Sequence, residues 1–117
     1  MQKNLDELSN AMNEMVTNGQ LVEAAEKYYA PNIRTVEFDG RVTEGKQAAM
    51  KKLNDFVSSI QKVNEIALVR SASSDNASFS EFRLNVEMKD GSVLDLYEIV
   101  RSLWENGQVT EERYFKG

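Results

Sequence analysis

The chemistry open to this chain is limited by two residue types that it lacks. Its 117 residues include no Cys and no His, which excludes cysteine nucleophiles, Ser-His-Asp triads, imidazole acid–base catalysis and zinc sites built from Cys and His. Carboxylates, tyrosines, lysines, arginines and hydroxyls remain. We therefore look for a carboxylate that could move a proton beside a phenol or a cation, and we predict no metal and no cofactor.

Arg101 and Glu112 are the first candidates, because two tight turns place them opposite each other. Asp90-Gly91 and Asn106-Gly107 are strong hairpin signals, and two-residue loops at both would give an antiparallel register in which Arg101 faces Glu112. The surrounding face is mostly apolar, so this ion pair is costly to desolvate unless a ligand, water or further hydrogen bonds complete it. Arg101 could then bind a substrate carboxylate or enolate. Alternatively, the pair is structural and only fixes the register.

Glu37 is a third candidate, as a general base near the end of a short predicted strand. A glutamate in this role needs apolar surroundings that favour its protonated form, and tyrosine rings could supply them. The alternative is an exposed glutamate at a strand end. Apolar and phenolic side chains from the helices and from the hairpin face are predicted to bind the ligand: Met12, Tyr28, Phe82, Tyr97, Ile99 and Tyr114. Tyr97 and Tyr114 could instead be core residues whose hydroxyls reach water.

The elements that must position these residues follow from hydrophobic periodicity and from turn residues. The expected elements are helices at 5–18 and 21–30, a strand at 33–38, a helix from an N-cap at Thr43 to 60, and strands at 66–72, 77–88, 93–104 and 108–116. Helices followed by antiparallel strands are typical of an α+β domain. We expect the three helices to pack on the concave face of one curved sheet and to leave a cavity beside it.

The totals of the sequence limit its class and its partners. A length of 117 residues suits one domain, residues 1–117. A net charge of −5 disfavours binding to a nucleic-acid backbone, which needs clustered Lys and Arg. The first ten residues lack the basic and apolar regions of a signal peptide, and no window has the roughly 20 apolar residues of a membrane span. We therefore predict a cytoplasmic protein with no nucleic-acid and no membrane partner.

Four short patterns, taken in order and spacing, resemble the nuclear transport factor two-like superfamily, in particular its SnoaL-like and ketosteroid-isomerase-like cone domains. They are Gly19 between two helices, Tyr29-Ala30-Pro31-Asn32 entering a strand, Glu44-Gly45-Lys46-Gln47 opening the long helix, and Asn106-Gly107-Gln108-Val109 leading into the last strand. The resemblance spans nearly the whole chain. It implies a curved sheet wrapped around three helices, a pocket at the wide end, and frequent dimerisation through the outer sheet face.

The resemblance also implies positions for catalytic groups. In the ketosteroid-isomerase-like branch a carboxylate late in the first strand is the general base, and a Tyr with a protonated Asp forms the oxyanion hole. The base position falls on Glu37. The other two positions fall on Met12 and Ile99, which cannot donate a hydrogen bond to an enolate, so that particular mechanism is not expected here.

The second face of the sheet is predicted to be apolar too, which favours a homodimer because an isolated domain should not expose so much apolar surface. The predicted contact residues are Leu96, Val100, Trp104 and Phe115. The leading hypothesis is a small-molecule-binding cone, as an isomerase- or cyclase-type enzyme that moves a proton on a small apolar or carboxylate-bearing carbonyl compound. The alternative is a non-catalytic dimerisation or partner-binding domain with a vestigial pocket. A cavity of a few hundred Å3 that reaches Arg101 and a carboxylate would favour the first, and a core filled by side chains would favour the second.

Overall fold

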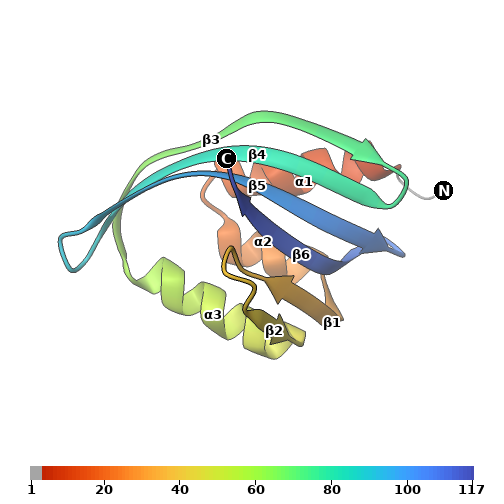
Figure 1. Cartoon of the computed structure of the whole chain (residues 1–117), viewed down its shortest axis with the longest axis horizontal. Coiled ribbons are helices and arrows are strands. Elements are labelled where there is room, and N and C mark those ends of the chain that lie inside the picture. The colour runs from red at the N-terminus through yellow and green to blue at the C-terminus, as the bar shows by residue number, and fades with distance from the viewer. Residues whose placement is uncertain (1–3) are drawn as a thin grey trace.

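The computed structural model describes residues 4–117, which form three helices and six strands (Figure 1). In chain order these are α1 (Leu5–Thr17), α2 (Leu21–Tyr28), β1 (Tyr29–Val36), β2 (Val42–Glu44), α3 (Lys46–Ser58), β3 (Ile60–Ser74), β4 (Ala77–Met88), β5 (Val93–Glu105) and β6 (Gln108–Lys116). No helix in this part of the chain is long and apolar enough to cross a membrane.

The helix boundaries follow local capping chemistry. Asn4 caps α1, because its side-chain oxygen accepts a hydrogen bond from the Glu7 backbone N–H at 2.9 Å. Gly19, with φ of +83°, ends that helix as predicted. The predicted N-cap of the third helix was wrong. Thr43 lies in the short strand β2 opposite Thr35, and Gly45 precedes α3 with φ of +92°, a conformation that glycine adopts without strain.

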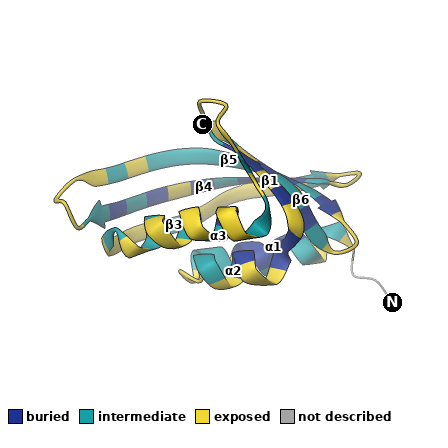
Figure 2. Cartoon of the chain, turned by 90° about the horizontal axis from the view of Figure 1, so that it is seen from below, coloured by how far each residue is buried: buried dark blue, intermediate teal, exposed yellow. Residues whose placement is uncertain are grey.

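The strands form one six-stranded mixed sheet in the order β2-β1-β6-β5-β4-β3, in which β1 and β6 are parallel and the other neighbours antiparallel. The sheet curves, and all three helices lie on its concave side (Figures 1 and 2). The predicted α+β cone is confirmed. Buried residues of α1, α2, β1, β5 and β6 make up the core between the layers: Met12, Ala24, Ala25, Tyr28, Tyr29, Ile33, Trp104 and Val109, with Ala49 of α3.

The loop between β4 and β5 is one residue longer than predicted. Lys89, Asp90 and Gly91 form a three-residue loop that Met88 closes by donating its backbone N–H to the Ser92 carbonyl at 2.8 Å. Gly91 has φ of +92°, as a loop of this kind requires at its last position. Asp90 Oδ1 also accepts from the Ser92 backbone N–H at 2.8 Å. The extra residue moves the whole pairing by one position.

The loop between β5 and β6 is the predicted two-residue turn, Asn106-Gly107, with positive φ at both residues. The register still differs from the prediction beyond it, because Trp104 pairs with Val109 and Leu103 then pairs with Glu111. This shift is a β-bulge at Thr110.

The two shifts exchange the predicted faces of β5, since a one-residue slip turns every side chain to the other side of the sheet. In the structure Phe82 of β4 pairs with Glu98 and Leu84 pairs with Leu96, each one position away from the predicted partner. In this register the concave face receives the more apolar half of β5, namely Leu94, Leu96, Val100 and Trp104. Removal of this larger apolar area from water favours the observed register.

Candidate functional site

A cavity of about 650 Å3 lies between the concave face of the sheet and the helices. Its walls are mainly apolar, and its polar groups gather at two ends. One end contains side chains that reach solvent, among them Phe38, Lys52 and Lys116. The other end contains buried side chains of α1 and the sheet: Ser9, Met12, Asn13, Ser78, Ser80, Ser102 and Trp104. A volume of this size suits a small organic ligand.

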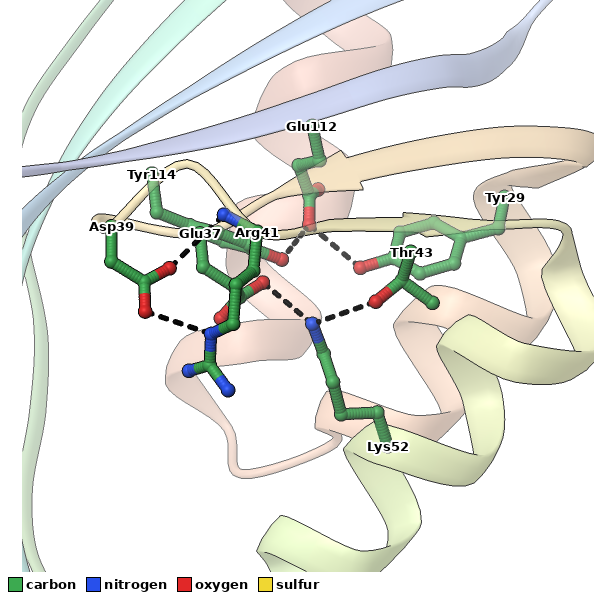
Figure 3. A network of polar contacts seen from close by, with 8 residues as sticks. All are labelled: Tyr29, Glu37, Asp39, Arg41, Thr43, Lys52, Glu112 and Tyr114. Carbon is green, nitrogen blue, oxygen red and sulfur yellow. Dashed lines mark hydrogen bonds and ion pairs between the residues drawn. The ribbon is translucent and has the colours of Figure 1, made fainter.

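The exposed end is organised by the ammonium group of Lys52. Figure 3 shows this side chain reaching from α3 toward the β1–β2 hairpin, with Nζ 2.7 Å from Glu37 Oε2 and 3.2 Å from Thr43 Oγ1. An ion pair and a hydroxyl acceptor thus account for two of the three N–H donors of Lys52. Glu37 lines the cavity but is held in this pair.

Glu112 is a buried carboxylate bound by hydroxyl groups. Its Oε1 accepts from Tyr29 at 2.6 Å and from Tyr114 at 2.5 Å (Figure 3), and Ser102 lies 3.5 Å from Oε2. Burial raises the pKa of Glu112, while the hydrogen bonds from Tyr114, Tyr29 and Ser102 oppose that rise by stabilising the charged form. Burial and the adjacent carboxylate also raise the pKa of both tyrosines well above the ordinary value, so their hydroxyls stay protonated and donate to Glu112.

Glu98 is a cavity carboxylate without such partners. It lies on β5 between Phe82 of β4 and Lys116 of β6, and its side chain forms no hydrogen bond or ion pair with another residue from 4 to 117. Burial, the largest effect, and the negative charges of Glu112 and Glu37 raise the pKa of Glu98 to about 7. A group with this pKa is present in both protonation states near neutral pH and can either accept or give a proton.

The described residues include no group of three or more His, Cys, Asp or Glu side chains that could hold a metal ion. Glu37, Glu98 and Glu112 line one cavity without converging on a common point.

No protein-family model matches the sequence, and no curated protein matches it. Solved structures do. A proposed SnoaL-like polyketide cyclase from Mesorhizobium loti is 25% identical, with a TM-score of 0.86 over 97% of this chain and 99% of that chain. An NTF2-like protein of unknown function from Burkholderia pseudomallei is 13% identical, with a TM-score of 0.79 over 99% and 92%. A protein of ketosteroid isomerase-like fold from Catenulispora acidiphila, in complex with trimethylamine, is 12% identical, with a TM-score of 0.76 over 95% and 85%.

The chain has the nuclear transport factor two-like fold. Within this fold, five predicted site residues line the cavity: Met12, Glu37, Phe82, Glu112 and Tyr114. Tyr28 does not line it, because this buried ring packs edge-on against Trp104 at 5.8 Å between centroids.

Three predicted site residues lie on the other face of the sheet, so their assignment was wrong. Arg101 forms an ion pair with Glu111 and pairs across the strands with Arg113, not with Glu112. Tyr97 donates to Glu81 on the same outer face, where Ile99 also lies. All three positions belong to β5, and the register shift is the physical cause.

The sequence prediction missed several polar residues of the cavity, among them Lys52, Ser80 and Glu98. Glu98 was missed because the predicted register, with Arg101 facing the cavity, turns Glu98 to the outer face. Two features of the sequence do indicate that Glu98 faces the cavity. Lys89-Asp90-Gly91 fits a three-residue hairpin loop with glycine at its end, and that loop gives the observed faces. The alternation of β5 agrees, since Leu94, Leu96, Val100 and Trp104 form its more apolar side.

The predicted dimer surface is wrong at three of its four residues. Leu96 and Val100 line the cavity, and Trp104 is 5% exposed in the core. Phe115, which is 41% exposed, alternates with the inward Tyr114 and lies on the outer face. Dimerisation itself stays a prediction.

Proposed function

We propose that this protein binds a small, mainly apolar organic molecule in the 650 Å3 cavity and moves a proton on it, with Glu98 as the acid–base group. The observation that carries the proposal is the unpartnered Glu98 carboxylate in an apolar wall. Partial burial of the side chain and the charges of Glu112 and Glu37 increase its affinity for a proton. This is the environment that a general base working near neutral pH requires.

Lys52 is the group we assign to hold negative charge on the substrate. Its ammonium lines the same cavity and has one N–H donor beyond those that bind Glu37 and Thr43. A cation near a carbonyl oxygen stabilises the enolate that forms when a base removes the adjacent proton. Arg101 has no part in this role, because it lies on the outer face.

An uncharged carbonyl compound fits this cavity better than a carboxylate-bearing one. Three glutamates line the cavity, and its two lysines are engaged, Lys52 by Glu37 and Lys116 over the ring of Phe38 at 5.6 Å. A substrate carboxylate would therefore meet mostly negative charge. The Catenulispora acidiphila protein of this fold forms a complex with trimethylamine, which supports only the general binding of a small organic molecule.

The proposal is tested with 2-tetralone, a neutral bicyclic ketone, in D2O at pH 7.5. We expect the protein to accelerate exchange of the protons next to the carbonyl, measured as loss of their NMR signals. The Glu98→Gln variant should lose about 100-fold or more of this acceleration, the usual contribution of a positioned acid–base group.

The matched control is Glu65→Gln, which changes an exposed glutamate of β3 outside the cavity and should leave exchange unchanged. Equal exchange in the Glu98→Gln variant would refute the role of Glu98. Binding of 2-tetralone with no exchange in the wild type would favour the alternative, a non-catalytic binding domain.

A further inference from the structure

Two buried serines line the cavity, Ser78 and Ser80, and the hydroxyl proton of each lacks a hydrogen-bond acceptor among residues 4–117. Ser78 is 3% exposed and accepts a hydrogen bond from Trp104 Nε1 at 2.9 Å. Ser80 is 5% exposed and accepts one from Asn13 Nδ2 at 2.9 Å. Neither hydroxyl donates to any residue between 4 and 117, although a hydroxyl has one proton to give.

Each of these hydroxyls therefore uses its oxygen as an acceptor but has no acceptor for its own proton. A buried donor without an acceptor is destabilising, so nearly all buried polar groups in proteins have partners. Both serines line the cavity, and their O–H bonds can rotate toward it. A rotation of 180° about the last side-chain bond of Asn13 exchanges the positions of its amide oxygen and nitrogen. Ser80 would then donate to Asn13, and the amide N–H2 would become the free donor, so the pair offers a donor to the cavity in both arrangements.

The serines and Glu98 lie at opposite ends of an apolar stretch. Ser80 pairs with Val100, and Phe82 pairs with Glu98, so Ser80 and Glu98 are two residues apart along adjacent strands. Strand geometry puts their Cα atoms about 8 Å from each other, and puts Ser78 about 14 Å from Glu98. Phe82 and Val100 line the cavity between them.

We propose that Ser78, Ser80 and Asn13 form a subsite for an uncharged acceptor oxygen, a carbonyl or ether, at the far end of the molecule whose proton is moved at Glu98. This inference rests on the proposed function. The oxygen is uncharged because the buried end of the cavity has no cationic side chain among its described residues, and an unpaired anion would be costly there. The three residues determine specificity and orient the ligand.

Two matched ketones test the subsite. The first is 6-acetyl-2-tetralone, and the second is 6-isopropenyl-2-tetralone, in which a CH2 group replaces the distal oxygen. Dissociation constants are measured by calorimetry, and exchange of the protons next to the ring carbonyl is measured by NMR in D2O. We expect the wild type to bind the acetyl compound roughly fivefold to tenfold more tightly, as one or two neutral hydrogen bonds provide.

The Ser78→Ala/Ser80→Ala double variant is made in an Asn13→Leu background, because the Asn13 amide loses its acceptor at Ser80 and could donate in place of the serines. It should bind the two ketones within about twofold of each other, since all three proposed donors are then absent. Ser80→Ala alone should lose part of the preference and leaves the acceptor of Trp104 in place. The control is Ser71→Ala, which changes an exposed serine of β3 that pairs with Ser80 across the strands, and it should keep the full preference. Circular dichroism checks the fold of each variant.

Equal binding of the two ketones by the wild type would overturn the subsite, and so would a preference that survives in the double variant. In both cases, exchange of the isopropenyl compound by the wild type shows that the proposed function stands. If neither ketone binds, the proposed function and the subsite fail together.

Discussion

Glu112 and Glu98 are two cavity carboxylates, on the adjacent strands β6 and β5, with opposite surroundings. Glu112 accepts hydrogen bonds from two tyrosine hydroxyls and has Ser102 nearby, whereas Glu98 has no partner among the described residues. The first arrangement stabilises a charge inside the protein, and the second makes a charge costly. The difference teaches that burial alone does not set the charge state of a carboxylate in this cavity, since hydrogen bonds oppose the effect of burial at Glu112 and none do so at Glu98.

Replacing each glutamate by leucine gives the largest expected contrast in stability. Glu112→Leu leaves the hydroxyls of Tyr29 and Tyr114 without their acceptor, so we expect the free energy of unfolding to fall by about 3 kcal/mol. Glu98→Leu removes an unpartnered charge from an apolar wall and should raise the free energy of unfolding by about 1–2 kcal/mol. Urea unfolding at pH 7.5 measures both. Similar losses in the two variants would break the comparison.

The pH dependence of stability gives the next largest effect. The pKa of Glu98 is about 7 in the folded chain against an ordinary 4.5, so the folded state keeps a proton that the unfolded state releases between these values. Stability should therefore fall as pH rises from 4.5 to 7, by up to about 3 kcal/mol from this group.

Glu98→Gln should remove this part of the slope, which chemical unfolding across that pH range would reveal. The raised pKa of Glu112 has the same sign and should leave a residual slope in the variant. An unchanged slope would mean that Glu98 titrates normally.

Removing one tyrosine hydroxyl should have a smaller effect. Tyr29→Phe deletes one of the hydrogen bonds that oppose the raised pKa of Glu112, so that pKa should rise further and stability at pH 7.5 should fall by about 1 kcal/mol. The matched variant is Tyr28→Phe, because Tyr28 lies next to Tyr29 in the chain and, within residues 4–117, forms no hydrogen bond with Glu112. It should leave the titration of Glu112 unchanged when both are followed by carboxyl NMR.

The smallest effect is expected at the exposed end of the cavity. Lys52 is 45% exposed at its side chain, so its ion pair with Glu37 should contribute about 0.5 kcal/mol or less to stability. Lys52→Met would leave the charge of Glu37 unbalanced, and this should raise the pKa of Glu98 further. Carboxyl NMR of Glu98 measures the change, and Lys51→Met, which breaks the exposed pair with Asp55 instead, serves as the control.

Much of the fold could be predicted, because its signals are local. The stripe of α1 and its stop at Gly19, and the turn at Asn106-Gly107, each depend on residues close together in the chain. The first strand was predicted too late, because β1 begins at Tyr29 and not at Ile33. The short strand β2 was missed, since its three residues carry little periodicity and Thr43 also suits a helix cap.

The site was harder to predict, because it depends on which side of the sheet each residue faces. The sequence by itself excluded the chemistry of Cys and His, and five of its predicted site residues line one cavity: Met12, Glu37, Phe82, Glu112 and Tyr114. Only the tertiary structure decided between Glu98 and Arg101 on β5. One extra residue in the Lys89–Gly91 loop and one bulge at Thr110 reverse that strand. Local signals allow both a two-residue and a three-residue loop here, and the choice between them is fixed by burial of the apolar side of β5 on the concave face, which depends on distant segments of the chain.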